Sequence, residues 1–318
     1  MRNSDISDAV TEFESSGVRK VELCLGTVQF GMDYGIRGKR KPPLSDCLAM
    51  LDYALHNGIN TIDTANAYGE AEEVVGAYLK KVPEARQKIY LISKFRPNLL
   101  DDVPVERYYS IMRANLEESL RRLCTDHLDG YLLHSARYVY NDEIIEALVR
   151  LKKEGYVRNI GVSVYEVDEA KKGLSRKDLD LLQFPFSVLD QRMLHQGVFE
   201  LAEQNRFPIH TRSAFVQGLV MMAPEEVPPF LQKKAAPVLR AVETVCRETG
   251  LSRAQLAIGF VKRQRAIAHL VFGVRDLEQL EEDIRVFSED LPTGVTEELE
   301  HSFADVEADI VMPSLWKK

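Results

Sequence analysis

Short apolar runs alternate with longer segments in which apolar residues recur every three or four positions, and this alternation extends along nearly the whole chain. The short runs predict β-strands and the longer segments predict amphipathic helices, because side chains repeat with a period of 2 in a strand and 3.6 in a helix. The expected strands are residues 21–25, 60–62, 89–93, 128–133, 160–164, 179–184, 208–210 and 269–272. The expected helices are residues 45–56, 70–80, 107–123, 141–154, 167–172, 193–204, 254–263 and 277–287. At the start of the fourth helix, Asn141 is a good N-cap residue, and Asp142 and Glu143 suit the positive end of the helix dipole.

Eight strand-then-helix units follow one another without a linker rich in proline or glycine. This order predicts one closed (β/α)8 TIM barrel, with all 318 residues in a single domain. A doubly wound open sheet is the alternative, but it would normally carry a GxGxxG turn after its first strand, and the chain has none. We expect residues 1–20 to form a polar N-terminal extension. Residues 220–237, which contain four prolines, are expected to form an inserted loop after the seventh strand.

Composition narrows the class of protein further. The chain is 45% hydrophobic and 28% charged, which is typical of globular proteins, and its formal net charge is −8. This acidic balance argues against nucleic acid or an anionic membrane as the main partner. No apolar run approaches the roughly 18 residues of a membrane span, and the polar start does not resemble a signal peptide, so we expect a cytoplasmic protein. Because Cys24, Cys47, Cys124 and Cys246 stand far apart, neither a disulfide framework nor a metal site is expected.

Three consecutive strand-like runs lead into titratable residues. These residues are Asp63, Lys94 and His134, and Tyr68 follows Asp63 by five positions in the string DTANAYG. In a closed parallel barrel the chemistry lies at the carboxyl ends of the strands, so the four side chains are expected at one mouth. Taken alone, each residue is more often a solvated rim residue or a structural one than a catalyst. Their occurrence together on successive strands favours catalysis.

The four side chains suit the reduction of a carbonyl group. An aldehyde or ketone that accepts hydride becomes an alkoxide and needs a proton, which Tyr68 could donate. Free tyrosine has a pKa of about 10, and a neighbouring Lys94 ammonium would make it more acidic. Asp63 would keep a buried Lys94 charged, and His134 could donate a hydrogen bond to the carbonyl oxygen.

The residues at this point resemble the aldo-keto reductase family. The matching segments are LGTVQFG (25–31), GINTIDTANAYGEAEEVVG (58–76), ISK (92–94), LLH (132–134), GVS (161–163), LLQFPFS (181–187), RSAFVQGL (212–219), AQLAIGF (254–260) and FGVRDLEQLEED (272–283). They occur in the family's order from about residue 20 to residue 287. Single short segments such as GVS carry little information, whereas the DTANAYG string and the ordered series are specific.

The resemblance implies a role for each matching residue. Tyr68 is the general acid, Lys94 tunes it, Asp63 pairs with Lys94 and also serves the nicotinamide ribose, and His134 orients the carbonyl. The family binds a nicotinamide cofactor without a Rossmann turn. Ser163 and Gln183 match positions that hold the carboxamide. The positions over the pyrophosphate are Ser213, Phe215, Gln217 and Gly218, and those at the adenosine end are Gly273, Arg275, Gln279, Glu282 and Asp283.

Arg275 matches a position where the family often places a basic group on the 2′-phosphate. A planar guanidinium binds phosphate at two points, so we expect NADPH rather than NADH as the cofactor.

The chain departs from the family pattern at three positions. Val164 and Asp283 each replace a common asparagine, near the carboxamide and near the adenine. Arg212 stands where many relatives have a tyrosine that stacks on the nicotinamide. We expect its guanidinium to help orient that ring or to bind an anionic group of the substrate, and the match with the stacking position favours the ring. None of the three changes affects the four catalytic positions.

The substrate itself is not specified by the pattern. Basic residues are nevertheless expected around the mouth, and they suggest a sugar-linked or anionic carbonyl compound: Arg37, Lys39, Arg40, Lys41, Arg96, Arg137, Arg192 and Arg212. Tyr34, Tyr138 and Tyr140 could supply apolar walls. Two other functions remain open. One is a cofactor-binding regulatory subunit with slow turnover, like the potassium-channel beta subunits. The other is a metal-dependent hydrolase that uses Asp126, His127, Asp129 and His134.

Overall fold

The protein is a closed barrel of eight parallel strands, seen here in a computed structural model that describes residues 21–38 and 40–316. Each strand pairs with its neighbours in chain order, and β8 closes the ring against β1. The strands are β1 (Glu22–Gly26), β2 (Thr61–Asp63), β3 (Tyr90–Phe95), β4 (Leu128–Leu133), β5 (Val157–Ser163), β6 (Leu181–Pro185), β7 (Ile209–Arg212) and β8 (Ile267–Gly273). The predicted (β/α)8 barrel is therefore confirmed. The proposed extension over residues 1–20 lies outside the described residues.

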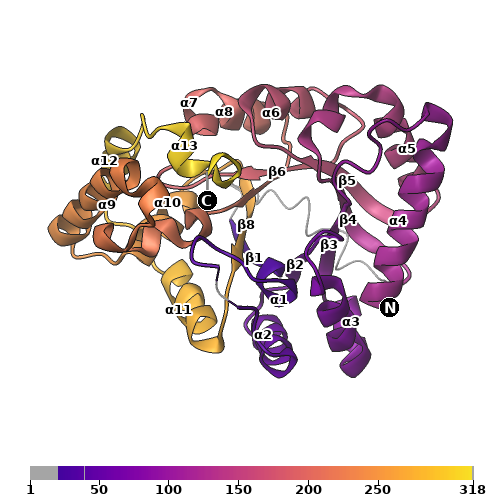
Figure 1. Cartoon of the computed structure of the whole chain (residues 1–318), viewed down its shortest axis with the longest axis horizontal. Coiled ribbons are helices and arrows are strands. Elements are labelled where there is room, and N and C mark those ends of the chain that lie inside the picture. The colour runs from indigo at the N-terminus through magenta and orange to yellow at the C-terminus, as the bar shows by residue number, and fades with distance from the viewer. Residues whose placement is uncertain (1–20, 39, 317–318) are drawn as a thin grey trace.

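Helices surround the strands as an outer ring (Figure 1). They are α1 (Val28–Gly31), α2 (Leu44–His56), α3 (Ala71–Lys81), α4 (Tyr108–Leu123), α5 (Asp142–Lys153), α6 (Val167–Leu174), α7 (Arg192–His195), α8 (Val198–Gln204), α9 (Pro229–Thr249), α10 (Arg253–Lys262), α11 (Leu277–Ser288), α12 (Val295–Ser302) and α13 (Ala308–Val311). Their apolar faces pack onto the strands and bury one large hydrophobic cluster. The side chain of Asn141 accepts a hydrogen bond from the backbone N–H of Ile144, which confirms it as the N-cap of α5.

The inserted loop predicted for residues 220–237 is wrong in its second half. Its proline-rich part ends at Pro228, and α9 begins at Pro229, where a missing N–H costs nothing because the first turn has no intrahelical acceptor for it. Pro237 lies inside α9 on the exposed face, so water can bind the carbonyl that loses its partner there.

Two other helix predictions also need correction. The single helix expected over residues 193–204 is two helices, α7 and α8, because Gly197 adopts a left-handed conformation with φ of 74° between them. Helices α12 and α13 lie beyond the last predicted element. Among the described residues, no helix is both long enough and apolar enough to cross a membrane.

Candidate active site

The carboxyl ends of β2, β3 and β4 bring three of the predicted side chains together. Asp63 is the last residue of β2, Lys94 is the fifth residue of β3, and His134 follows the end of β4. Lys94 is fully buried, and its Nζ donates to Asp63 Oδ1 at 2.6 Å and to the Thr64 carbonyl at 3.0 Å. The sequence therefore placed the acid and its cation correctly as a buried pair.

Tyr68 reaches this pair from the loop after β2. Lys94 Nζ lies 5.0 Å from the centroid of the Tyr68 ring, and the ring meets that of His134 edge-on at 5.6 Å between centroids. The loop is held by backbone contacts with the segment after β1: the N–H and hydroxyl of Thr27 both donate to the Asp63 carbonyl, at 2.9 and 3.0 Å.

Two glycines allow a close approach that fixes the position of Tyr68. A side chain at Gly31 would place its Cβ 1.7 Å from the Tyr68 carbonyl oxygen, so nothing larger than glycine fits there. Gly69 has a φ of +57°, and its own Cβ would lie 2.3 Å from the Gly31 carbonyl oxygen. This contact explains why the LGTVQFG and DTANAYG strings occur together: α1 is the support on which the tyrosine loop rests.

The charges at the site act on Tyr68 in opposite directions. Burial in the cavity wall raises the pKa of Tyr68, Lys94 lowers it, and the net pKa lies above its usual value. The sequence led us to expect a lowered pKa for Tyr68. That expectation is wrong, because the effect of burial outweighs the effect of the Lys94 ammonium. The phenol therefore keeps its proton at neutral pH, which is the form a proton donor requires. Although burial lowers the pKa of Lys94, Asp63 and Tyr68 raise it above its usual value, so Lys94 stays charged.

His134 is a neutral hydrogen-bonding group in this site. Burial, with the neighbouring charges of Lys94 and Arg212, lowers the pKa of His134 to about 3. A neutral imidazole retains one N–H that it can donate to a carbonyl oxygen.

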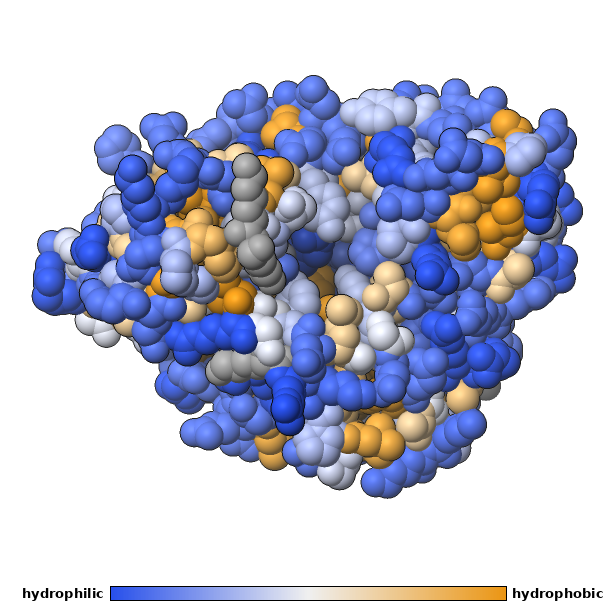
Figure 2. All heavy atoms as spheres, in the orientation of Figure 1, coloured by the Kyte–Doolittle hydropathy of each residue, from blue (hydrophilic) through white to orange (hydrophobic). Residues whose placement is uncertain are grey.

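A cavity of about 700 Å³ opens above these residues, a typical size for a small-molecule site. Figure 2 shows the hollow near the middle of this face of the molecule. Asp63, Tyr68 and His134 line the cavity, and Lys94 lies enclosed beneath it. The predicted cofactor residues that also line it are Arg212, Ser213, Phe215, Gln217, Gly218, Gly273, Arg275 and Gln279.

The remaining predicted cofactor residues are not among the cavity's lining residues. Ser163 is the last residue of β5 and Gln183 the middle residue of β6; both are buried, and the side-chain oxygen of each lacks a hydrogen-bond partner. Gln183 donates to Asp63 Oδ2 at 2.8 Å, so it belongs to the same polar network. Glu282 is exposed on α11, whereas Asp283 is buried, which raises its pKa to about 7 with the help of nearby acids.

The segment after β7 has a strained backbone. Ser213, Val216 and Gln217 have φ values of 66°, 47° and 54°, and Gly218 follows at 93°. For a β-branched residue such as Val216 this conformation is costly, and such strain concentrates at functional sites. Left-handed turns also point successive backbone N–H groups in one direction, which suits phosphate binding.

Sequence reasoning missed several residues of the cavity wall, including Gln29, Tyr165, Glu226 and Met312. Tyr165 could have been found, because it lies two positions beyond the end of β5, where barrel sites gather. Gln29 could have been found within the LGTVQFG string. Glu226 and Met312 come from irregular segments without any periodic pattern.

The basic mouth expected from the sequence is partly neutralised. Arg37 and Arg212 line the cavity, and Arg37 pairs with Glu226 at 2.7 Å. Others are paired with acids outside the cavity lining: Lys41 with Glu70, Arg137 with Asp101, and Arg192 with Asp190 and Glu166. Arg40 and Arg96 are exposed outside the lining, and Lys39 lies outside the described residues. Of the three tyrosines, only Tyr34 lines the cavity; Tyr138 is buried against Asp101 and Tyr140 is 52% exposed.

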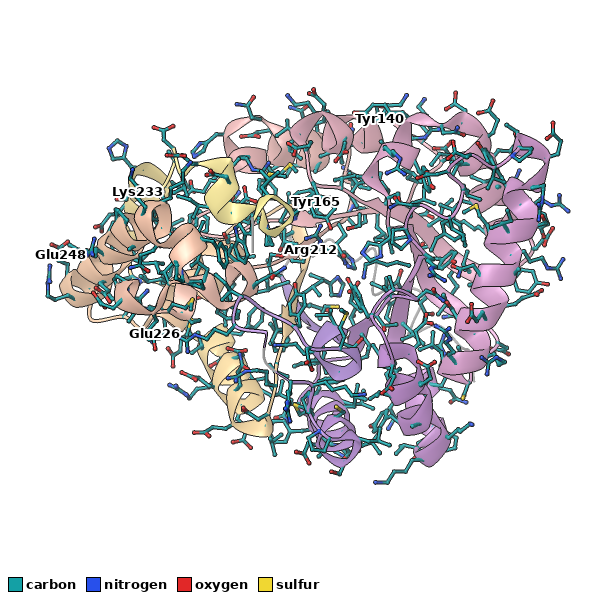
Figure 3. The ribbon with its side chains drawn as sticks, viewed as in Figure 1. Tyr140, Tyr165, Arg212, Glu226, Lys233 and Glu248 are labelled. Carbon is teal, nitrogen blue, oxygen red and sulfur yellow. The ribbon has the colours of Figure 1, made fainter. Side chains whose placement is uncertain are left out.

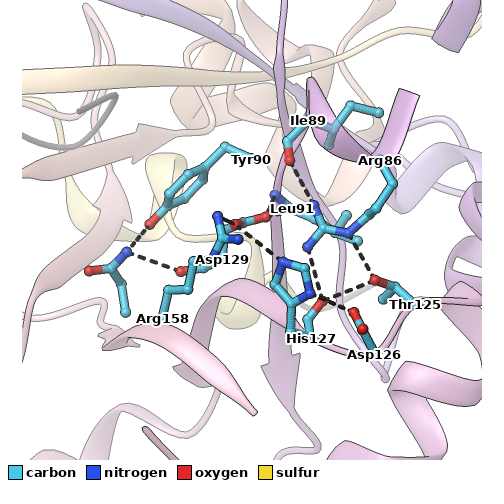
Figure 4. Close-up of polar contacts among 10 residues, drawn as sticks. Arg86, Ile89, Tyr90, Leu91, Thr125, Asp126, His127, Asp129 and Arg158 are labelled. Atoms are coloured by element: carbon cyan, nitrogen blue, oxygen red, sulfur yellow. Dashed lines mark hydrogen bonds and ion pairs between the residues drawn. The ribbon is translucent and has the colours of Figure 1, made fainter. Parts of the chain in front are cut away.

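The structure does not bring together the four residues of the hydrolase alternative. Asp129 lies at the amino end of β4, where Arg86 and Arg158 contact its carboxylate at 3.0 and 2.9 Å (Figure 4). His134 lies at the opposite end of the same strand. No set of three or more histidine, cysteine or acidic side chains within residues 21–38 and 40–316 is arranged to hold a metal ion.

Comparison with known proteins gives a consistent result. Residues 22–302 match the model described as "Aldo/keto reductase family". An uncharacterized oxidoreductase of Bacillus subtilis (strain 168) is 29% identical over 255 residues, which cover 75% of this chain and 81% of the relative. The NADH-specific methylglyoxal reductase of Escherichia coli (strain K12) is 26% identical, covering 75% of this chain and 81% of that protein. The solved structure of an aldo-keto reductase from Bacillus halodurans (holo form) has the same fold, with a TM-score of 0.71, 22% identity and coverage of 93% of this chain and 97% of that one.

Proposed function

Because the chain belongs to the aldo/keto reductase family, we propose that it is an NADPH-dependent oxidoreductase that interconverts an aldehyde or ketone with its alcohol. The family supports the reaction class, an oxidoreductase that uses a nicotinamide cofactor and a small carbonyl compound. The observation that carries the proposal is the buried Lys94–Asp63 pair beneath Tyr68, with neutral His134 beside the same ring.

Each side chain then has one task. A bound nicotinamide supplies the hydride in reduction and accepts it in oxidation. Tyr68 donates its phenolic proton to the oxygen of the carbonyl group as negative charge develops there. Lys94 stabilises the phenolate that remains, Asp63 keeps Lys94 charged, and His134 donates a hydrogen bond that holds the oxygen in place.

The cavity has the donors and acceptors that a nicotinamide cofactor needs. The strained turn after β7 lines the cavity and suits a pyrophosphate. The unpaired oxygens of Ser163 and Gln183 are buried outside the lining and would suit the amide hydrogens of a carboxamide that reached them.

The preference for NADPH rests on Arg275. It lines the cavity immediately before the N-terminal turn of α11, and it forms no ion pair with any described residue. A free guanidinium at a helix N-terminus suits the 2′-phosphate that distinguishes NADPH from NADH.

The four cysteines are free, which agrees with a reducing compartment and supports the cytoplasm as the location. The acidic chain also supports a small molecule, rather than nucleic acid or a membrane, as the partner. The substrate we propose is a sugar-linked or anionic carbonyl compound.

The test assays a panel of carbonyl compounds with NADPH and with NADH, for the parent and for Arg275→Ala. The loss of absorbance of the reduced cofactor measures turnover in each assay. Loss of a charge-assisted contact should weaken NADPH binding about ten- to a hundredfold and leave NADH binding unchanged. Equal weakening of both cofactors would contradict the role of Arg275. Slow turnover of every compound with tight cofactor retention would instead indicate the regulatory subunit.

A further inference from the structure

Arg212 is placed where it can contact both the substrate and the reacting groups. It is the last residue of β7, and its side chain lines the cavity that Tyr68 and His134 also line. His134 lines the same cavity, and the charge of Arg212 contributes to its lowered pKa. Figure 3 shows Arg212 and Tyr165 together near the centre of the barrel, and the guanidinium carbon lies 4.4 Å from the centroid of the Tyr165 ring.

The guanidinium has no counter-ion. Arg212 forms no ion pair with any residue of the described ranges, and its Nη2 is enclosed without a hydrogen-bond acceptor. The acids that line the cavity are Asp63 and Glu226. Asp63 is engaged by Lys94 and Gln183, while Glu226 pairs with Arg37. Arg212 is thus a partly enclosed cation whose donors are unsatisfied, an arrangement that costs free energy until an acceptor arrives.

Tyr165 fixes the direction in which those donors point. A guanidinium plane over an aromatic ring is held by cation–π attraction and stacking, and it leaves the N–H groups free at the edge of the plane. These N–H groups form a planar fork that matches the oxygens of a carboxylate or phosphate.

We propose that Arg212 anchors an oxyanion of the substrate, a carboxylate or phosphate carried by the same molecule whose carbonyl group meets Tyr68 and His134. This inference rests on the proposed function and narrows its substrate class to anionic carbonyl compounds. Tyr165 is a positioning residue that acts through Arg212.

The geometry favours this role over orientation of the nicotinamide ring. Arg212 already lies over the Tyr165 ring, with its guanidinium carbon 4.4 Å from the ring centroid, so a cofactor ring would have to approach the guanidinium from another side. In the oxidised cofactor that ring is a cation, and a second cation against it is unfavourable, whereas an anion gains from the contact.

The experiment compares matched charged and neutral substrates. The first pair is 4-oxobutanoate and its methyl ester, which tests a carboxylate, and the second is glyceraldehyde 3-phosphate and glyceraldehyde, which tests a phosphate. The parent should have a higher kcat/KM for the anionic member of at least one pair, and the pair that shows the preference identifies the oxyanion. Arg212→Met should lower that value about ten- to a hundredfold, mainly through KM, and leave the neutral member within about twofold.

Four further variants separate the anchoring role of Arg212 from general effects on the enzyme. Arg212→Lys keeps the charge without the planar fork and should restore part of the preference. Tyr165→Leu should weaken it, and Tyr165→Phe should keep it because the ring remains. Arg96→Met removes an exposed arginine that follows β3, outside the cavity lining, and should behave as the parent.

Binding without turnover gives an independent measurement. Titration calorimetry of the holoenzyme with succinate or inorganic phosphate should detect the anion in the parent and a loss of about tenfold or more in Arg212→Met. If Arg212→Met weakened NADPH binding and slowed both members of a pair equally, Arg212 would serve the cofactor and the anchor would be wrong. A parent without preference for either anion would also overturn it. Failure of the parent to reduce any carbonyl compound would contradict the proposed function, while the calorimetric result would still decide whether Arg212 binds an anion.

Discussion

Asp63 and Asp129 are both buried carboxylates with cationic partners, but they lie at opposite ends of the barrel and their surroundings differ. At the amino end, Asp129 forms an ion pair with Arg86 and accepts hydrogen bonds from Arg158 and from the backbone N–H of Leu91. Arg86 also donates from all three of its nitrogens to neighbouring oxygens. His127 Nε2 lies 4.0 Å from Asp129 Oδ1 and has no hydrogen-bond partner. This cluster ties together the starts of β3, β4 and β5.

At the carboxyl end the polar groups around Asp63 are incompletely paired. The atoms without partners there are Gln29 Oε1, Thr64 Oγ1, His134 Nδ1, Ser163 Oγ, Gln183 Oε1 and Arg212 Nη2. Buried polar groups without hydrogen-bond partners reduce stability. Their presence together at one site is therefore expected where a ligand supplies the missing partners. A buried ion pair alone therefore does not distinguish a structural cluster from an active site, whereas the unpaired atoms around it do.

We expect the largest effect from a substitution that removes one polar group from the carboxyl-end site and keeps its packing. Tyr68→Phe removes the proton donor and keeps the ring, so kcat for carbonyl reduction should fall about 10²- to 10⁴-fold. Steady-state kinetics would measure the fall, and cofactor titration should show binding close to that of the parent. Reduction at the parent rate would refute Tyr68 as the general acid.

The second prediction concerns the amino-end cluster. Asp129→Ala leaves Arg86 and Arg158 without their carboxylate, and removing one partner of a buried pair costs about 3 kcal/mol. We expect no more than this loss of unfolding free energy, because the Arg158 side chain is 51% exposed and water can solvate its charge. Urea unfolding would measure it, and kcat/KM per folded molecule should stay within about twofold of the parent. A large fall in kcat/KM with unchanged stability would show that Asp129 serves the reaction and not the stability of the barrel.

A third buried carboxylate, Asp283, shows what happens without a cation. Its burial, with Glu282 and Asp276 nearby, raises its pKa to about 7, and its Oδ2 has no partner. The folded state therefore binds a proton that the unfolded state releases above its pKa of 3.8. Stability from this group is present below pH 4 and is lost as the pH rises towards 7.

Between pH 5 and pH 7 the loss should be about 2 kcal/mol. Asp283→Asn cannot ionise. Between pH 5 and pH 7 the free energy of unfolding of the parent should therefore fall by about 2 kcal/mol relative to that of the variant. Urea unfolding of both proteins at the two pH values measures the difference. Parallel pH dependences would show that Asp283 ionises normally.

The sequence predicted the strands well, and it also predicted which polar side chains lie at their carboxyl ends, because both depend on local patterns. The run at residues 128–133 is β4 to the residue, and strand ends in a closed barrel must converge, which is why Asp63, Lys94 and His134 meet. Helix α9 was missed because its prolines read as a loop, and their tolerance depends on which face is exposed.

Charge at the mouth could not be predicted for a different reason. Basic residues such as Arg37 are neutralised by acids distant in the sequence, in this case Glu226. The net pKa of Tyr68 likewise depends on burial, which residue spacing does not measure.

The pairing of β1 with β8 has a consequence for the order of events in folding. Gly26 is in register with Gly273, and both border the cavity together with Thr27 and Arg275. The two sides of this seam are nearly the whole chain apart, and contacts of such long range form late because closing a long loop costs entropy. The proposed cofactor pocket straddles the seam, so it exists only once the ring has closed. If NADPH is the cofactor, as proposed, the change in its fluorescence on binding during refolding would time the closure of the barrel, and a cofactor that binds only the closed ring would stabilise it against opening.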